Sequence, residues 1–356
     1  MKIAHVTAFA PYGGADIQCE MLATCLHRQG VAQRVMAGGN PERSQRLRQA
    51  GLDVVDLELP GRLAFLARKR LDGELKRFTP DLVLSWRPEV SVLVERGGYK
   101  HIGRLPATFN SKAYMTCDAL LAPSKQRADA AVAAGWSMDK IHTVPDLPSI
   151  ALARPNPVEI ERRTLFTPAT ARIVFSAGRL EKSKSFDTLI DAVARLSSVY
   201  LWIAGDGPDR AFFEAHAYAK GMKPRVRFLG WVDDLQPYFR ASDLFVYPAK
   251  QEDLSDIVVE AWSAGAPVIA ADSLGPGLLI RHQENGVLVP VGDPVAMSDA
   301  IAWLLADQNA AERIGAAGKK SFDEEYEPSR LIDRYLKIFS GLGRTDDESV
   351  AAAGGT

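Results

Sequence analysis

The stretch Lys250–Asp272, KQEDLSDIVVEAWSAGAPVIAAD, predicts a loop, a helix and a strand in succession. It follows the apolar run LFVYPA at residues 244–249, which has the composition of a buried strand. Ser255 or Asp256 suits the N-cap of the helix, and Gly265 suits its end. A strand, a helix and a strand in this order are typical of a parallel α/β sheet.

Two carboxylates flank the predicted helix start. Glu252 falls in the loop at the carboxyl end of the strand, and Glu260 falls about one turn inside the helix. Helical side chains lean toward the N-terminus, so Glu260 points back to the sheet edge where open α/β sheets bind ligands. The pair suits a ligand that offers hydroxyl donors and an anionic group, such as a nucleotide sugar. The alternative is that Glu260 caps the helix or pairs locally.

Glu252, seven intervening residues and Glu260, followed by Ser-Ala-Gly and Pro-Val-Ile-Ala-Ala-Asp, resemble the E-x7-E signature of the family 4 retaining glycosyltransferases. This resemblance implies an α/β protein of the GT-B fold, in which two Rossmann-like, doubly wound domains face a cleft. It also implies transfer of a sugar from a nucleotide-diphosphate sugar, with a UDP-sugar favoured over GDP-mannose, to a hydroxyl group of an acceptor. No metal and no other cofactor are required in that scheme.

Length and charge agree with two domains. A chain of 356 residues with 47% hydrophobic residues can form two cores. Residues 1–150 hold 20 Lys and Arg against 15 Asp and Glu, and the remainder holds 23 against 29. The positive first half indicates an anionic partner, either a phosphorylated acceptor or a membrane surface, and we expect no nucleic-acid partner.

Three cysteines, Cys19, Cys25 and Cys117, have no metal-binding spacing and form no even disulfide set, which favours a reducing compartment. No signal peptide opens the chain and no run approaches the length of a transmembrane helix. We therefore expect a cytoplasmic protein, with peripheral contact to the inner face of the cytoplasmic membrane as a further hypothesis.

The expected organisation has five parts. Residues 1–150 form an acceptor-binding domain, and the Pro-containing, charged residues 151–171 form a linker. Residues 172–326 form the domain that binds the nucleotide sugar. Residues 327–341 form a final helix that, by the resemblance, crosses back to the first domain. Residues 342–356 are small and polar, which predicts a disordered tail.

The first forty residues predict a strand, a turn, a helix and a strand, which is a Rossmann-like opening. Gly13-Gly14 at the turn lacks the full G-x-G-x-x-G pattern of dinucleotide-binding proteins. The resemblance implies that the acceptor and the donor phosphate approach the backbone at Gly14. The alternative is a tight turn that needs positive φ.

Residues 61–78, GRLAFLARKRLDGELKRF, predict a basic amphipathic helix. Either it is a solvated helix packed on the sheet or its cations also contact anionic lipid. The cations of this helix are Arg62, Arg68, Lys69, Arg70, Lys76 and Arg77.

The first domain resembles the family more loosely. Family members carry a histidine at the sugar, and His101 in the predicted strand YKHIGRL is the candidate, although a lone histidine on a strand is commonly structural. The segment from Asp118 through Ser124 also resembles the family, but Asp146-Leu147 stands where an Asn-Gly pair is usual. The residues from Trp86 to Leu105 resemble glycosyltransferases of bacterial surface polysaccharide and lipopolysaccharide core assembly.

The second domain carries the donor candidates at its predicted strand ends. Arg179 and Lys184 match the family's diphosphate-binding pair, and two fixed cations can neutralise the charge that develops on a leaving diphosphate. The alternative is a surface loop with solvated charges. Ser185 replaces the family's usual glycine, and the loop SLGPGLLI, residues 273–280, lacks the usual acidic residue.

The resemblance implies that Glu252 and the following backbone amides hold the sugar, and that Glu260 accepts the ribose hydroxyls. The candidate catalytic residues are Arg179, Lys184, Glu252 and His101. The candidate donor-binding residues are Gly14, Gly178, Gly205, Asp206, Gly207, Trp231, Val232, Asp253, Leu254, Ser255, Asp256 and Glu260.

Two alternatives remain open at this point. One is a GT-B epimerase that isomerises a sugar nucleotide without an acceptor. The other is a non-catalytic subunit that binds a nucleotide sugar, a reading that the missing Asn-Gly pair allows.

Overall fold

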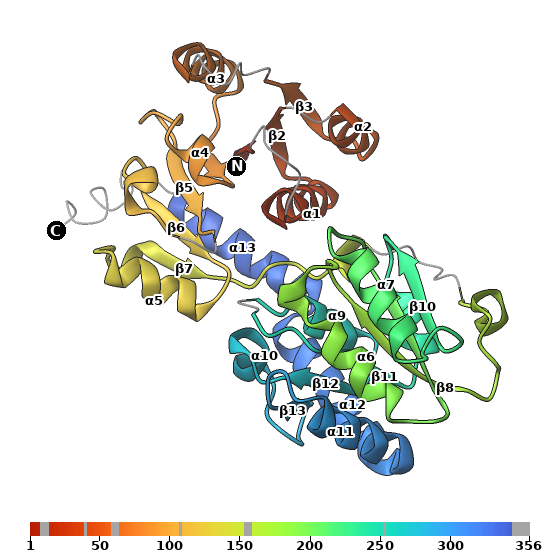
Figure 1. Cartoon of the computed structure of the whole chain (residues 1–356). Coiled ribbons are helices and arrows are strands. Elements are labelled where there is room, and N and C mark those ends of the chain that lie inside the picture. The colour runs from red at the N-terminus through yellow and green to blue at the C-terminus, as the bar shows by residue number, and fades with distance from the viewer. Residues whose placement is uncertain are drawn as a thin grey trace. The chain divides into compact units, whose positions relative to one another are not determined.

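The computed structural model describes residues 1–7, 14–38, 41–57, 64–106, 109–152, 159–251 and 254–343 (Figure 1). Several features named above lie outside these residues, among them Gly13, Arg62, Glu252, Asp253 and the tail from residue 344 onward. The chain divides into two compact units. The first contains Met1–Leu147 together with Pro328–Thr356, and the second contains Pro148–Glu327.

A seven-stranded parallel sheet forms the centre of the first unit. Its strands are β1 (Lys2–Val6), β2 (Ala32–Ala37), β3 (Asp53–Asp56), β4 (Leu82–Ser85), β5 (Lys100–Arg104), β6 (Ala119–Ala122) and β7 (Ile141–Thr143). The spatial order is β3-β2-β1-β4-β5-β6-β7. The direction of winding therefore reverses between β1 and β4, as in a doubly wound fold.

Helices cover both faces of this sheet. They are α1 (Gly14–Arg28), α2 (Pro41–Gln49), α3 (Ala64–Phe78), α4 (Pro88–Ser91), α5 (Lys125–Ala133) and α13 (Pro328–Gly343). Leu71 and Leu75 of α3 pack with Val6 and Val83 of the sheet in one buried cluster. The last helix, α13, is tied to this unit by a hydrogen bond of 3.1 Å from Arg334 Nη2 to the Thr143 carbonyl.

A six-stranded parallel sheet forms the centre of the second unit. Its strands are β8 (Arg172–Ala177), β9 (Val199–Ala204), β10 (Val226–Gly230), β11 (Leu244–Tyr247), β12 (Val268–Ala271) and β13 (Val287–Val289). The order β10-β9-β8-β11-β12-β13 reverses between β8 and β11. Both units thus have the predicted doubly wound α/β architecture.

Two buried clusters, one on each face, cover the second sheet. The helices are α6 (Phe186–Ala194), α7 (Arg210–Ala219), α8 (Gln236–Ala241), α9 (Asp256–Ser263), α10 (Leu274–Leu279), α11 (Pro294–Ala306) and α12 (Gln308–Glu325). Val174 packs in one cluster with α6, α7 and α11, while Phe175 packs in the other with α8 and α9. Because neighbouring strand residues serve opposite faces and both faces are covered, this strand has a continuous apolar run from Ile173 to Phe175.

Residues 159–171, expected in a linker, pack as part of the second unit. The buried Trp202 donates from Nε1 to Thr167 Oγ1 at 3.0 Å, and Arg227 Nε donates to the Leu165 carbonyl at 2.6 Å. Trp202 and Arg227 each carry a donor that needs an acceptor, and residues 159–171 supply those acceptors. The segment therefore packs against the second sheet.

A chain of hydrogen bonds runs through the core of the first unit at His5. Trp86 Nε1 donates to His5 Nδ1 at 3.2 Å, and an indole can only donate. His5 therefore carries its proton on Nε2, which lies 2.8 Å from Gln33 Oε1. Burial lowers the pKa of His5 to about 4, so the imidazole is neutral at pH 7.

This burial predicts a loss of stability in mild acid. The folded pKa of His5 lies below its unfolded value, so the unfolded chain binds more protons and stability falls as the pH drops below about 6.5. Between pH 7 and pH 5 we expect His5 to account for a loss on the order of 2 kcal/mol. His5→Asn should remove that part of the pH dependence in urea titrations, with hydrogen exchange of β1 amides assigning it to this unit. An unchanged pH dependence in the variant would contradict a neutral, buried His5.

Candidate active site

The strongest candidate site lies where the winding of the second sheet reverses. The loops that follow β8 and β11 meet there: Lys250 N donates to the Ser183 carbonyl at 3.1 Å. Lys184 Nζ donates to Tyr247 Oη, at the end of β11, at 3.4 Å. These contacts bring the Arg179–Lys184 loop beside the chain that leads into α9. Ligands of open α/β sheets bind at this kind of position.

The two predicted cations differ in their surroundings. Arg179 is 69% exposed, and its Nε lies 3.5 Å from Glu181 Oε2. Lys184 is partly buried at the end of a 3₁₀ turn, Lys182–Lys184, and is oriented by Tyr247. Ser185 follows with φ of +50°, a left-handed conformation that glycine adopts without strain. The backbone therefore keeps the shape of a glycine turn although the residue is serine.

Gly205 and Gly207 are required by close contact between loops. A Cβ at Gly205 would lie 1.9 Å from the Gly178 carbonyl oxygen, and one at Gly207 would lie 2.4 Å from the Leu180 carbonyl oxygen. The Leu180 amide donates to the Asp206 carbonyl at 3.0 Å. The packing of the β8 and β9 loops thus explains both glycines without a ligand. Asp206 itself accepts from the Gly207 amide and from Arg210.

Helix α9 presents its first turn and Glu260 at the same edge. Burial is the main cause that raises the pKa of Glu260, and the nearby Asp234 raises it further. The hydroxyl and the backbone amide of Ser149 both hydrogen-bond the carboxylate and oppose that rise. Part of the Glu260 side chain remains accessible to solvent. Glu260 is therefore an oriented acceptor at the sheet edge.

The start of α9 also contains a buried hydroxyl. Ser255 is only 3% exposed, and its Oγ has no hydrogen-bond partner among the residues that the structure describes. Leu254 is partly buried and Asp256 is exposed. Backbone amides at a helix N-terminus favour anions, so this turn suits a phosphate or sugar hydroxyls.

Trp231 and Val232 follow β10 at the same edge of the sheet. Trp231 is 70% exposed, and its Nε1 donates to Asp233 Oδ1 at 3.0 Å. Val232 is partly buried and packs against the core on the α9 face. An exposed indole is an apolar face available to a ligand, which is consistent with a base neighbour.

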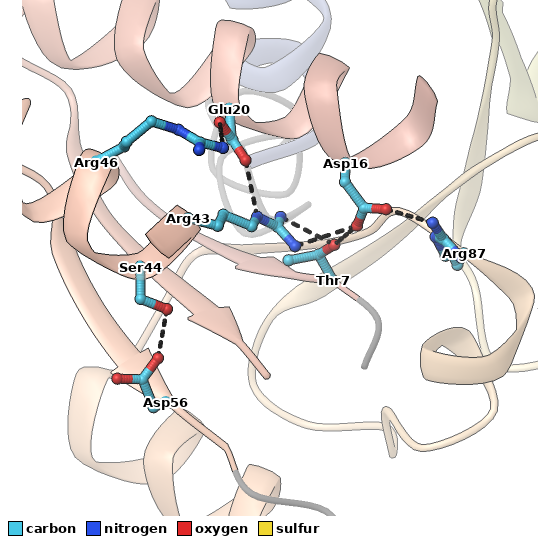
Figure 2. Close-up of polar contacts among 8 residues, drawn as sticks. All are labelled: Thr7, Asp16, Glu20, Arg43, Ser44, Arg46, Asp56 and Arg87. Atoms are coloured by element: carbon cyan, nitrogen blue, oxygen red, sulfur yellow. Dashed lines mark hydrogen bonds and ion pairs between the residues drawn. The ribbon is translucent and has the colours of Figure 1, made fainter. Parts of the chain in front are cut away.

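The first unit carries a buried ionic network at the carboxyl edge of its sheet, as Figure 2 shows. Asp16, 1% exposed, accepts from Thr7 Oγ1 at 2.6 Å and from Arg43 at 3.2 Å, and also pairs with Arg87. Arg43 Nε lies 3.0 Å from Glu20 Oε1. Because buried charges need paired, hydrogen-bonded partners, this network fixes the first turn of α1 beside the ends of β1 and β4.

Gly14 and His101 occupy opposite edges of the first sheet. Gly14 begins α1 after the carboxyl end of β1, has no left-handed φ, and has open space around it. The tight-turn explanation therefore does not apply to Gly14 itself, whose backbone is accessible to a ligand.

His101 requires a correction. It is the second residue of β5, which reaches its carboxyl end three residues later at Arg104, about 10 Å further along the sheet. Its ring is buried, with Nε2 2.9 Å from Ser85 Oγ and Nδ1 3.2 Å from Thr116 Oγ1. Burial lowers the pKa of His101 to about 4. The structure does not bring His101 to the ligand-binding edge of its sheet, and the structural alternative describes it better.

Sequence reasoning missed several residues at these edges. Tyr247 is the last residue of β11, and its hydroxyl is the one polar side-chain group in the predicted strand LFVYPA. Arg87 lies two residues after the buried strand β4 and gives the same signal. No sequence signal identifies Ser149, because its contact with Glu260 forms only when the first residues of the second unit fold against α9.

Two further observations concern the described residues alone. No group of three or more His, Cys, Asp or Glu side chains is placed to hold a metal ion. None of the described helices has the length and apolar character needed to span a bilayer.

Solved structures share this architecture. HepE from Anabaena, crystallised in complex with UDP, superposes with a TM-score of 0.83 at 20% identity, covering 96% of this chain and 100% of HepE. WaaG, described as a glycosyltransferase involved in lipopolysaccharide biosynthesis, gives a TM-score of 0.69 at 17% identity, covering 95% and 100%. At these identities the likeness is one of fold, and it defines the fold as GT-B.

Sequence relatives identify the family. Residues 157–321 match the model of glycosyl transferases group 1. The lipopolysaccharide core biosynthesis glycosyltransferase LpsE of Rhizobium meliloti is 30% identical over 355 residues, covering 96% of this chain and 99% of LpsE. LpsD of the same organism is 31% identical over 346 residues, covering 95% and 98%. The chain belongs to the glycosyl transferases group 1 family and is a glycosyltransferase.

The contact between the β8 and β9 loops yields a prediction with a matched control. Gly205 and Gly221 both have positive φ, but a Cβ at Gly221 meets nothing within 4 Å. Gly221→Ala should therefore cost only the left-handed strain of about 1 kcal/mol. Gly205→Ala should cost roughly 3 kcal/mol more, because the Gly178 carbonyl must move. Urea titration of the two variants measures the difference, and equal costs would show that the two loops do not depend on this close contact.

Proposed function

We propose that this enzyme is a retaining glycosyltransferase that moves a sugar from a UDP-sugar to a hydroxyl of a glycan or lipid-linked acceptor in lipopolysaccharide core assembly. The names of LpsE and LpsD support the process. The structures of HepE with UDP and with UDP-glucose support the donor class. The proposed location is the cytoplasm, with peripheral contact to the inner face of the membrane.

The observation that carries the proposal is the contact between the Arg179–Lys184 loop and the chain that leads from β11 toward α9, where the second sheet reverses. Arg179 and Lys184 would hold the diphosphate and neutralise the charge that develops as the sugar–phosphate bond breaks. Fixed cations of this kind can contribute about 3 kcal/mol each, because they need no reorganisation during the reaction. The exposed Arg179 would have to move inward from Glu181 to serve this role.

The glutamates have separate proposed roles. Glu260 would accept the ribose hydroxyls, since its carboxylate is oriented by Ser149 and points to the sheet edge. Glu252 and the backbone amides of Asp253 to Asp256 would hold the sugar, a role that rests on the E-x7-E resemblance because Glu252 and Asp253 lie outside the described residues. The proposal gives His101 no part in the transfer.

The mass of the products tests the reaction. With a panel of nucleotide sugars and a lipopolysaccharide core acceptor, we expect a glycosylated acceptor and free UDP. An isomerised donor would support the epimerase instead, and no product together with tight donor binding would support a binding subunit. The anomeric configuration of the product, read by NMR, tests retention.

The role of Glu260 predicts both an affinity change and a pH dependence. Glu260→Gln should weaken UDP and intact UDP-sugar equally, by roughly ten- to a hundredfold, because charged acceptors make the stronger hydrogen bonds. The pKa of Glu260 is raised by burial, so UDP affinity of the wild type should fall as the pH drops toward that pKa. The glutamine variant should lose that dependence in calorimetric titrations.

Ser149→Ala is the matched control for this experiment. It removes a hydrogen bond that lowers the pKa of Glu260, so the fall in UDP affinity should begin at a higher pH while affinity at pH 8 is kept. If Glu260→Gln lost sugar discrimination but bound free UDP normally, the roles of the two glutamates would be reversed.

The proposed contact with the membrane rests on α3. Phe65 is 75% exposed and Leu66 is 44% exposed, which places apolar side chains beside the basic residues of the helix. Among the described residues, Arg68 pairs with Glu95, Lys76 with Asp72, and Arg77 with Glu74. The charge available to lipid is thus smaller than the count of cations.

Replacing Lys69 and Arg70 of α3 with Gln should weaken binding to anionic vesicles. Each cation near such a surface adds about 1 kcal/mol, so the double variant should lose roughly thirtyfold in affinity at low salt. Vesicle co-sedimentation measures this, and UDP affinity should not change. Lys125→Gln on α5 is the control for removal of an exposed cation. Failure of the wild type to sediment with anionic vesicles at low salt would remove the membrane contact from the proposal.

A further inference from the structure

The first unit has a hollow of about 580 Å³ at the amino edge of its sheet, opposite the edge that carries Gly14 and Arg87. Its walls come from the residues that precede or begin β4, β5, β6 and β7, and from the end of α13. The volume lies in the range of small-molecule sites, about 300 to 1,000 Å³. The proposed transfer does not use this edge.

Three cations from two segments line the hollow: Arg96 and Lys100 from the chain that leads into β5, and Lys140 just before β7. In the described part of the chain, none of the three forms an ion pair or a side-chain hydrogen bond. Two carboxylates also line it, but both accept from the protein itself. Asp81 accepts from the Lys2 amide at 2.6 Å and lies 3.8 Å from the N-terminal amine, and Asp118 accepts from the His101 amide at 2.7 Å.

The inner wall of the hollow is polar and uncharged. His101 contributes a neutral imidazole whose two nitrogens already lie against Ser85 and Thr116. Gly97 and Gly98 contribute exposed backbone without side chains. A ligand would therefore meet three cations, open backbone and two carboxylates that are each held by a donor of the protein, which leaves the charged lining with one more cation than anion.

We propose that this hollow binds a phosphate monoester. A phosphate carries nearly two negative charges at neutral pH and accepts several hydrogen bonds, and lysine and arginine are its usual partners. The ester can come from a soluble sugar phosphate or from a lipid headgroup, because both present the same group. The site lies wholly in the first unit and does not depend on the proposed donor chemistry.

Gly98 offers a precise test. A Cβ at Gly98 meets no atom within 4 Å and its φ is not left-handed, so Gly98→Asp adds a negative charge to the hollow without steric cost. Gly73→Asp on α3 adds the same charge at a glycine that is equally free of contacts and does not line the hollow. We expect sn-glycerol 3-phosphate to bind the wild type and Gly73→Asp alike in low-salt calorimetry, and to bind Gly98→Asp at least tenfold more weakly.

Three further arms separate the explanations. Saturating UDP should leave glycerol 3-phosphate binding unchanged, and loss of binding would place the phosphate in the donor site and overturn the proposal. The absence of saturable binding, or equal weakening by both aspartates, would overturn it as well. Vesicles containing phosphatidic acid distinguish the source: displacement by glycerol 3-phosphate, seen in the wild type and lost in Gly98→Asp, identifies a lipid headgroup. Binding of the soluble ester without displacement identifies a soluble phosphate.

Discussion

The second unit depends on one close approach between two backbones. Gly205 sits so near the Gly178 carbonyl that any side chain at position 205 would overlap it. The same loops are joined by amide–carbonyl bonds from Gly178 to Ala204 and from Gly205 to Gly230. Three successive strand ends are therefore locked to one another. Lys184 follows the first of these strand ends and Trp231 follows the last, so the scaffold sets the positions of both residues.

Most of this edge could be predicted from the sequence because its signals are local. Buried parallel strands are continuous apolar runs, and each ends where glycine and charged residues begin. The spacing of apolar residues predicts the helix that contains Glu260, and Gly265 predicts where this helix ends. The physical origin of the glycines was not predictable in the same way. The sequence predicts Gly205 and Gly207 as donor-binding residues. Contact with the neighbouring loop, which is distant in sequence, already requires both glycines.

The first unit shows where such reasoning stops. A histidine within a five-residue strand can lie near either edge of a sheet, depending on where the strand begins and ends. Because β5 begins at Lys100, His101 lies at the amino end of the strand. Residues 41–57 were not predicted as a helix and a strand, because α2 is highly charged and β3 is a four-residue edge strand. Arg43 of α2 is nonetheless buried, since Asp16 and Glu20 of α1 pair with it. A pattern of hydropathy cannot reveal such a contact.

The net positive charge of residues 1–150 overstates the charge available to a ligand, because several of the cations are paired with carboxylates. A net charge counts every cation as available, but Arg43 and Arg87 are committed to Asp16, and Arg104 is committed to the buried Asp146. These pairs stabilise the carboxyl edge of the sheet, where a strong excess of positive field would otherwise be expected. Three cations without side-chain partners among the described residues, Arg96, Lys100 and Lys140, lie instead at the opposite edge, around the hollow. Attraction for an anion is set by this local imbalance, because solvent screens charges beyond about 10 Å.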